Sequence, residues 1–408
     1  MKILILSKAL LAASYQHQLN VLADEPGVEV AAVVPPAWRE PGVGVIPLER
    51  PAAAGYRLIV RPIALNGHFH LYYWPGLGRL LRAERPDVLH VDEESFNLAT
   101  WQALSWAMRL GIPALFFSWA NIYRRLPPPF AWFERYNLAH AAFAVAGNQE
   151  AAAILRRKGY GGKLRVIPQF GVDENVFTPL PTPRSPLSAP RPGGQGEECT
   201  IGYAGRLVPP KGVPDLMEAV AGIPGARLLL VGGGEQEAAL RRRAEERDLA
   251  GRVEFAGRVP SERLPEMYRR MDLFVLPSRT TPRWKEQFGR VLVEAMACGV
   301  PVVGSESGEI ANVIGAAGLT YPEGDVAALR ERLARLLGDA ALREELGRRG
   351  RERVLGHYTQ ERVAGAYMEV YREVRRGGGK TGRREDVGTL ERWDAPATRV
   401  LPLAHFLR

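Results

Sequence analysis

Cysteine is scarce in this chain of 408 residues, which contains only Cys199 and Cys298. Two cysteines cannot form a disulfide framework or a zinc site built on cysteine ligands, so a reducing, cytosolic compartment is expected. Long apolar runs are also missing, because no stretch reaches the roughly 18 apolar residues that a membrane span requires. The run within residues 1–15 is broken by Ser7 and Lys8 and predicts a core strand rather than a signal peptide. We therefore expect a cytoplasmic protein, with peripheral contact to the inner face of a membrane as an open alternative.

A strong charge bias is absent as well. The chain has 54 Lys and Arg against 45 Asp and Glu, a net charge of +9, and these charges are spread along the sequence. This diffuse excess gives no support to nucleic-acid binding and favours anionic ligands only weakly. The histidines have no spacing that suggests a metal site, and no Asp-x-Asp pair occurs. We expect no metal and no resident cofactor.

Length and composition predict a globular protein of several domains. At about 150 residues per domain, the chain is long enough for two or three domains. Hydrophobic residues make up 46% and charged residues 24% of the chain, which is close to the globular norm. Short apolar runs alternate with helical patterns, and the strands expected from them are residues 3–6, 28–34, 88–91, 114–117, 201–203, 227–231, 273–276 and 300–303. Such alternation predicts an α/β protein with parallel sheets covered by helices.

A stretch rich in proline and glycine separates the first four strands from the last four. That composition is incompatible with a helix or a strand. We therefore predict a linker at 173–199 between a first domain, 1–172, and a second domain, 200–357. The helical pattern at 358–376 is expected to complete the first domain, and 377–408 to form a flexible tail. Ligands of doubly wound domains sit beyond the carboxyl ends of the strands. The cleft between the domains is therefore the expected site.

Two glutamates eight residues apart flank a predicted helix start. Glu286 precedes a helix expected over 291–297, and Glu294 lies inside that helix. Both carboxylates can border a ligand at the helix N-terminus, where free backbone N–H groups attract a phosphate. The alternative is an ordinary pair of solvated surface glutamates.

A second segment, Gly205-Arg206-Leu207-Val208-Pro209-Pro210-Lys211-Gly212, follows the strand at 201–203. It places two cations five residues apart on one loop. Arginine can fork onto phosphate oxygens, while lysine supplies a compact charge. Together with a helix N-terminus, Arg206 and Lys211 can stabilise a departing diphosphate without a metal.

These two motifs resemble the donor half of the retaining glycosyltransferases of family four, also called glycosyl transferases group 1. The second motif reads Glu-x-Phe-Gly-x-x-x-x-Glu-Ala-Met-Ala-Cys-Gly-Val-Pro from Glu286. Further matches lie at residues 231–234, 255–260, 276–278 and 167–173. The resemblance covers most of the chain up to Arg375 and implies a GT-B fold, in which two doubly wound Rossmann-like domains face each other across a deep cleft.

The resemblance also implies roles for individual residues. Arg206 and Lys211 would bind the diphosphate and Glu286 a hydroxyl of the transferred sugar, which makes these three the expected catalytic residues. Glu294 would bind the ribose hydroxyls. The full set expected to contact the nucleotide sugar is Gly205, Gly233, Arg258, Val259, Gln287, Phe288, Gly289, Arg290, Val291 and Glu294.

The chain departs from the family pattern in several places. Gln169-Phe170-Gly171-Val172-Asp173 stands where many members have Asn-Gly-Val-Asp, and Gln287 stands where they have glycine. Members often carry Thr-x-His-Asp in the first domain, but here the segment is Phe117-Ser118-Trp119-Ala120-Asn121. No catalytic histidine can therefore be carried over. His90, at the end of a strand, is either a structural histidine or a substitute acid-base group.

We expect a retaining glycosyltransferase that moves a sugar from a nucleoside diphosphate sugar to a glycan or lipid-linked acceptor. Aromatic and basic residues between 116 and 133 suit a sugar or lipid-linked acceptor or an anionic membrane surface, although ordinary packing explains most of them. The alternative is a non-catalytic protein that binds nucleotide sugars or glycans. A dinucleotide-dependent oxidoreductase is excluded, because Glu237 stands at the third glycine position after Gly232-Gly233-Gly234.

Overall fold

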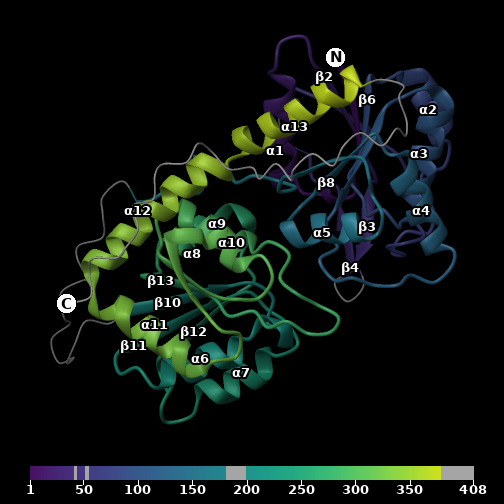
Figure 1. Ribbon diagram of the computed structural model, residues 1–408. Coiled ribbons are helices and arrows are strands. Elements are labelled where there is room, and N and C mark those ends of the chain that lie inside the picture. Colours follow the sequence, from purple (N-terminus) through teal and green to yellow (C-terminus); the bar gives the residue numbers. More distant parts are fainter. Residues whose placement is uncertain (41–43, 51–54, 181–198, 378–408) are drawn as a thin grey trace.

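Two parallel β-sheets, each covered by helices, form the two halves of the molecule (Figure 1). The computed structural model describes residues 1–40, 44–50, 55–180 and 199–377. The first sheet has the strand order β5-β2-β1-β6-β7-β8-β9, and the second has the order β12-β11-β10-β13-β14-β15. All pairings within both sheets are parallel. The predicted α/β class with two doubly wound domains is confirmed.

The strands form because short apolar runs are buried on both faces of each sheet. In β1, Ile3 and Ile5 pack into one core of the first domain, whereas Leu4 packs into the other. The strands of the first sheet are β1 (Lys2–Leu6), β2 (Glu29–Val34), β5 (Arg57–Val60), β6 (Val88–Val91), β7 (Ala114–Ser118), β8 (Phe143–Ala146) and β9 (Lys163–Val166). Those of the second sheet are β10 (Cys199–Ala204), β11 (Ala226–Val231), β12 (Val253–Gly257), β13 (Leu273–Leu276), β14 (Val302–Ser305) and β15 (Gly318–Tyr321). A separate antiparallel pair joins β3 (Ala37–Glu40) to β4 (Gly44–Pro47).

The helices follow the alternation that the sequence predicts. Those of the first half are α1 (Ala13–Ala23), α2 (Leu77–Glu84), α3 (Leu98–Leu110), α4 (Phe130–His140) and α5 (Gln149–Arg157). Those of the second half are α6 (Val213–Ala221), α7 (Glu237–Ala244), α8 (Leu264–Tyr268), α9 (Arg290–Ala297), α10 (Ile310–Ile314), α11 (Val326–Gly338) and α12 (Ala340–His357). No helix in the described part of the chain is both long and apolar enough to cross a membrane.

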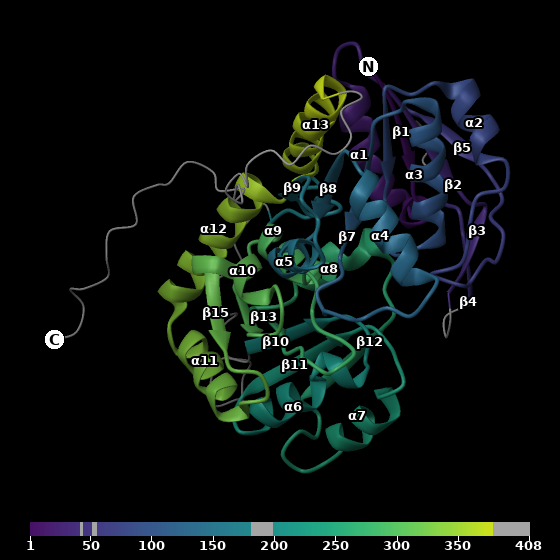
Figure 2. The same ribbon diagram turned by 45° about the vertical axis from the view of Figure 1, so that its right-hand side comes forward.

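The last described helix, α13 (Gln360–Arg376), returns to the first half of the molecule and lies beside α1 in both ribbon views (Figure 2). Val363 and Tyr367 of α13 share a buried core with Leu19 of α1. The two chain crossings between the halves are adjacent, because Val172 forms a bridge with Thr359. The domain limits that we predicted remain a proposal. The predicted linker at 173–199 and tail at 377–408 lie largely outside the described residues.

Within the two parallel sheets, five of the described strands were not expected, and four of them are sheet edges: β5, β9, β12 and β15. An edge strand is buried less completely, so its apolar run is shorter and mixed with charges, as in Lys163-Leu164-Arg165-Val166. The fifth, β8, is buried but contains two alanines, which are depleted in strands. The helix α12 was also missed, because arginine and glutamate dominate its sequence.

Both sheets have a topological switch point. In the first sheet the strand order reverses between β1 and β6, and in the second between β10 and β13. The loops that follow these strands are where a doubly wound fold places its ligand.

Candidate active site

Lys211 and Glu286 lie in contact across the switch point of the second sheet. Lys211 Nζ donates to Glu286 Oε2 at 2.5 Å, and the Ser278 hydroxyl donates to the same oxygen at 2.8 Å. Glu286 is buried, and a buried carboxylate requires such partners. The Lys211 ammonium also lies 4.9 Å from the ring centroid of Trp284. The structure therefore brings together two of the predicted catalytic side chains and adds two neighbours, Ser278 and Trp284, that the motif analysis did not assign to the site.

Gly212 fixes the turn that presents Lys211. Its φ of +65° favours glycine, and a Cβ at this position would lie 1.9 Å from the carbonyl oxygen of Pro277. The backbone N–H of Arg279 donates to the carbonyl of Pro210 at 2.7 Å. The loop after β10 is therefore packed directly against the loop after β13.

Arg206 stands on the same loop as Lys211, and its side chain is exposed. Its carbonyl oxygen accepts a hydrogen bond from the Tyr203 hydroxyl at 2.8 Å. Burial raises the pKa of Tyr203; the charge of Glu286 raises it further, and the charge of Arg206 lowers it. Arg206 follows the carboxyl end of β10, which is the end of the sheet where Lys211, on the same loop, contacts Glu286.

Gly205 and Gly233, two of the residues predicted to contact the nucleotide sugar, lie on the neighbouring loops after β10 and β11. Gly205 N donates to Val231 O, and a Cβ on Gly232 would lie 1.9 Å from the carbonyl oxygen of Gly205. A Cβ on Gly233 would lie 3.4 Å from Arg258 Cγ. Val259, next in sequence, packs on the hydrophobic core. Close backbone approach is what glycine permits, so the loops after β10, β11 and β12 meet at one edge.

The helix α9 begins at Arg290, with Gly289 as its N-cap in the left-handed region at φ +77°. The first N–H groups of a helix have no partner within it, and they carry the positive end of the helix dipole. Arg290 and Val291, in the first turn, were both predicted to contact the ligand. The structure therefore places a helix start where the sequence predicts one.

Glu294 is buried inside α9, and each of its carboxylate oxygens accepts one hydrogen bond. Its Oε1 accepts from Arg290 Nε at 2.8 Å, and its Oε2 accepts from the Tyr268 hydroxyl at 2.8 Å. The alternative of two solvated surface glutamates is wrong, since Glu286 is buried as well. Each carboxylate oxygen can accept a second hydrogen bond, so Glu294 retains capacity for a ligand hydroxyl.

Gln287 and Phe288 face the first domain. Gln287 Nε2 donates to the carbonyl of Trp119 at 3.1 Å, and the Phe288 and Trp119 ring centroids are 5.8 Å apart. The Trp119 indole N–H donates to Gln169 Oε1 at 2.9 Å. Two departures from the family pattern, Gln169 and Gln287, therefore both contact Trp119 of the third, the segment 117–121. Their separation in sequence concealed this link.

The loops at the switch point of the first sheet are acidic. Asp92 accepts from Ser7 Oγ at 2.5 Å and from Gln169 Nε2 at 2.7 Å, and burial raises its pKa to about 6. Glu93 pairs with Lys8 at 2.6 Å. Glu94 accepts from the Ser118 hydroxyl and from the backbone N–H of Trp119, and burial raises its pKa to about 7.

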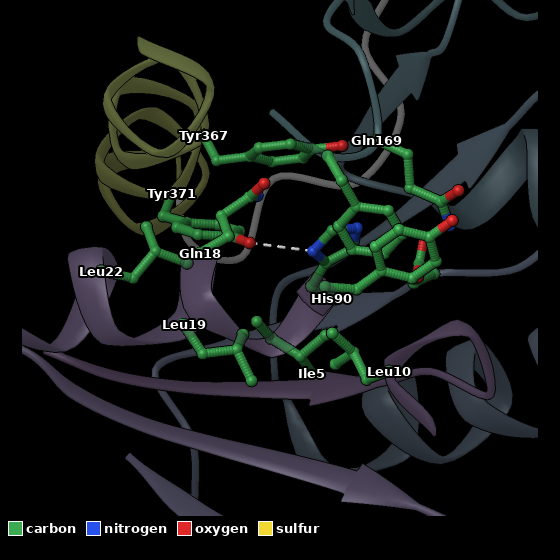
Figure 3. A pocket seen from close by; sticks show the side chains of 12 residues that line it. Ile5, Leu10, Gln18, Leu19, Leu22, His90, Gln169, Tyr367 and Tyr371 are labelled. Carbon is green, nitrogen blue, oxygen red and sulfur yellow. Dashed lines mark hydrogen bonds between the residues drawn. The ribbon is translucent and has the colours of Figure 1, made fainter. Parts of the chain in front are cut away.

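His90 is a buried structural residue rather than a group facing the donor loops. Figure 3 shows its ring beneath α13, where His90 Nδ1 lies 2.8 Å from the Tyr371 hydroxyl. Burial lowers the pKa of His90 to about 3, so the ring is neutral at ordinary pH. Of the predicted aromatic acceptor residues, Phe116 and Phe117 are core residues of β7, whereas Tyr123 and Trp132 are exposed.

Among the described residues, no group of three or more His, Cys, Asp or Glu side chains is arranged to hold a metal ion.

Two facing Rossmann-like domains with a lysine, a glutamate and a helix N-terminus at one switch point define a GT-B type of glycosyltransferase.

Comparison with known proteins gives the same result. The family described as "Glycosyl transferases group 1" matches residues 189–353, and "Glycosyl transferase 4-like domain" matches residues 6–169. Together these matches cover most of the chain. The chain belongs to the group 1 glycosyltransferases, and the predicted family is confirmed.

The similar proteins are transferases of sugars. The lipopolysaccharide core biosynthesis glycosyltransferase LpsE of Rhizobium meliloti is 27% identical over 87% of this chain and 94% of its own length. A GDP-mannose-dependent phosphatidylinositol monomannoside mannosyltransferase of Corynebacterium glutamicum is 35% identical, but the match spans 47% of this chain and about half (51%) of the relative. The structure of sucrose-phosphate synthase from Thermosynechococcus elongatus superposes with a TM-score of 0.68 at 25% identity, covering 92% of this chain and 99% of that one. That of Anabaena HepE in complex with UDP has a TM-score of 0.67 at 18% identity, covering 91% and 100%; it bears on the fold alone.

Proposed function

We propose that the protein is a retaining glycosyltransferase that takes a sugar from a nucleoside diphosphate sugar without a metal ion and transfers it to a glycan or lipid-linked acceptor. The observation that carries the proposal is the contact of Lys211 Nζ with Glu286 Oε2 at 2.5 Å, with Arg206 on the same loop as Lys211 and α9 starting shortly after Glu286. A cation, a hydrogen-bonding carboxylate and free N–H groups are what a sugar diphosphate requires.

The residues have separate tasks in this proposal. Lys211, Arg206 and the N–H groups of α9 stabilise the charge on the departing diphosphate, which is the usual source of rate enhancement at such sites. Glu286 accepts a hydrogen bond from a sugar hydroxyl, and Glu294 accepts from the ribose. These roles agree with the chemistry of each side chain, because carboxylates accept and cations face oxyanions.

The reaction proceeds on one face of the sugar. The bond between the anomeric carbon and the diphosphate oxygen breaks, the acceptor oxygen bonds to the same face of that carbon, and the acceptor proton moves to the departing phosphate oxygen. We favour this internal-return route over one with a covalent intermediate. It conserves the anomeric configuration.

The relatives support an acceptor from the cell envelope. The names of the similar proteins refer to lipopolysaccharide core and to phosphatidylinositol monomannoside. We propose a glycan or lipid-linked acceptor that approaches the first domain, with the protein in the cytoplasm and in peripheral contact with the membrane. Exposed aromatic residues of that domain, Tyr123 and Trp132, suit such an approach.

A screen of UDP, GDP and ADP sugars tests the proposal. A ligand that binds only the folded state raises the melting temperature by mass action, so one nucleotide series should raise it more than the others. Slow hydrolysis of the matching sugar nucleotide, followed by proton NMR, should release the sugar first as the anomer present in the donor. Binding without any turnover would favour the non-catalytic alternative, and release of the opposite anomer would exclude retention.

A further inference from the structure

Two asparagines of the first domain hold the peptide that carries Glu286 in the second domain. Asn121 Nδ2 donates to the carbonyl of Glu286 at 3.1 Å, and Asn148 Nδ2 donates to the carbonyl of Gln287 at 2.8 Å. Both asparagines are buried. A buried amide that loses its partner carries a desolvation penalty, so these bonds favour one position of the loop relative to the first domain.

Each asparagine is itself fixed in place. Asn148 is the N-cap of α5, because its Oδ1 accepts from the backbone N–H of Ala151 at 2.7 Å. Asn121 follows Trp119, whose backbone N–H is held by Glu94 at 2.8 Å. The two amides therefore project from anchored backbone rather than from free loops.

The contact continues around the asparagines. Next to Asn148, the side chain of Glu150 pairs with Lys285 at 2.6 Å, and Gln287 Nε2 returns a hydrogen bond to the carbonyl of Trp119 at 3.1 Å. The residues 285–287 are thus bound to the first domain at successive positions. The α5 helix lies next to the second half of the molecule in both ribbon views (Figure 1 and Figure 2).

The second domain holds the same loop from the other side. The backbone N–H of Glu309 donates to Glu286 O at 3.2 Å, and a Cβ on Gly308 would lie 2.0 Å from that carbonyl oxygen. The Glu286 carboxylate is set by Lys211 and Ser278, both of the second domain. The carbonyl of Glu286 therefore accepts one bond from each domain, and only the bond from Asn121 is lost when the domains separate.

We infer that Asn121 and Asn148 are positioning residues that couple the approach of the two domains to the orientation of the Glu286 peptide. The inference rests on the proposed function, since it assigns a regulation to the same site. Their amides bind backbone carbonyls and do not occupy the carboxylate of Glu286, which is proposed to bind the sugar. Hinge closure around a ligand is a common way to complete a site, and a displacement of about 1 Å at such a site can cost on the order of 100-fold in rate.

The tests use the full chain with Asn121→Asp and Asn148→Asp. Each change keeps the size of the side chain, and Asn148→Asp also keeps the Oδ1 acceptor that caps α5. Each replaces the amide donor with an oxygen that faces a carbonyl oxygen. Turnover of the sugar nucleotide identified by the screen should fall roughly 10- to 100-fold in kcat. The Kd for UDP or GDP, measured by calorimetry, should stay within about twofold, because the proposed nucleotide contacts belong to the second domain.

Two further variants separate positioning from stability. Asn148→Ser keeps a capping side chain but is too short to reach Gln287, so it should lose kcat as Asn148→Asp does. Asn137→Asp is the matched control: Asn137 is buried, and its Nδ2 donates to Ser95 O at 2.7 Å within the first domain. It should lower the melting temperature while folded molecules keep their kcat. Full kcat in Asn148→Ser and Asn121→Asp would overturn the inference.

A scattering measurement decides the inference even if no turnover is found. The double variant Asn121→Asp/Asn148→Asp should have a larger radius of gyration by small-angle X-ray scattering than the unaltered protein, with and without UDP or GDP. Identical scattering curves would overturn the inference. Absence of turnover in the unaltered protein with every sugar nucleotide would instead count against the proposed function.

Discussion

The two switch points of the molecule have the same topology but opposite chemistry. Beyond β10 and β13 of the second sheet, Lys211 and Arg206 stand with a helix N-terminus around one principal carboxylate, Glu286. Beyond β1 and β6 of the first sheet lie three successive acids, 92–94, and Lys8 pairs with one of them, Glu93. A diphosphate demands cations and N–H groups, whereas an acceptor hydroxyl demands hydrogen-bond acceptors. The fold therefore provides two equivalent positions, and the residues placed there decide which substrate each can hold.

The largest effect is expected from removing the Lys211 cation at the switch point of the second sheet. Lys211→Met should lower transfer by roughly two or more orders of magnitude, the usual scale for loss of a preorganised charge-stabilising group. It also leaves the buried Glu286 without its ion partner, so part of any loss can come from instability. The double variant Lys211→Met/Glu286→Gln removes that unpaired charge and should recover melting temperature but not activity. If Lys211→Met keeps nearly the activity of the unaltered protein, the cation at the second switch point is not required for transfer, and the contrast between the two switch points is wrong.

The next effect tests how rigidly the loop after β10, which carries Lys211, is packed against the loop after β13. Gly212→Ala should destabilise the protein by about 2 kcal/mol more than Gly225→Ala, because overpacking adds to the left-handed strain. Both glycines have positive φ, at +65° and +78°, but an added Cβ meets Pro277 O at 1.9 Å in the first and nothing within 4 Å in the second. Urea unfolding measures the difference. Equal losses in the two variants would show that the loop after β10 can move away from the loop after β13.

The same contrast explains what the sequence could predict. The proposed donor site was recognisable in the sequence because its glycines, Arg206, Lys211 and Glu286 occur in short motifs, and because the helix that follows is apolar and periodic. The interior strands other than β8 were predicted because burial on both faces requires an apolar run. Edge strands and α12 were missed, since partial burial leaves no such signal.

Contacts between distant segments had no local signature. Tyr268, Asn121 and Asn148 contribute to the candidate site through side chains whose partners lie at least 26 residues away along the chain. Ser278 and Asn121 each end a segment that the sequence singled out, whereas Tyr268 and Asn148 had no such signal. Three-dimensional proximity, rather than residue type, made these two recognisable.

The acidic side provides a smaller effect that depends on pH. Folding raises the pKa of Glu94 from 4.5 to about 7, chiefly through burial. The native state therefore holds this proton more tightly than the unfolded state, and stability falls as pH rises from about 4.5 to 7, with the full penalty present above that range. Glu94→Gln removes the penalty, so its stability relative to the unaltered protein should improve by about 2–3 kcal/mol between pH 5 and pH 8.

Unfolding in urea at several pH values checks this slope. The constant cost of losing one hydrogen bond to Ser118 or Trp119 shifts the whole curve and does not enter the comparison. Glu309→Gln is a matched control in the second domain, since burial also raises the pKa of Glu309 to about 7, and a similar slope is expected. A flat difference for Glu94→Gln alone would mean that the first switch point is more hydrated than its burial suggests.

The smallest effect concerns His90, which lies on β6 yet belongs to neither side of this contrast. Tyr371→Phe removes the hydroxyl 2.8 Å from His90 Nδ1 and should cost about 1 kcal/mol, the usual net value of one hydrogen bond. Activity and its pH dependence should stay unchanged, because a ring whose pKa burial lowers to about 3 carries no charge at any pH where the enzyme folds and works. A displaced limb in the pH–rate profile of Tyr371→Phe would reassign His90 to acid-base chemistry. The helix α13 would then belong to the acceptor side rather than only covering the sheet behind it.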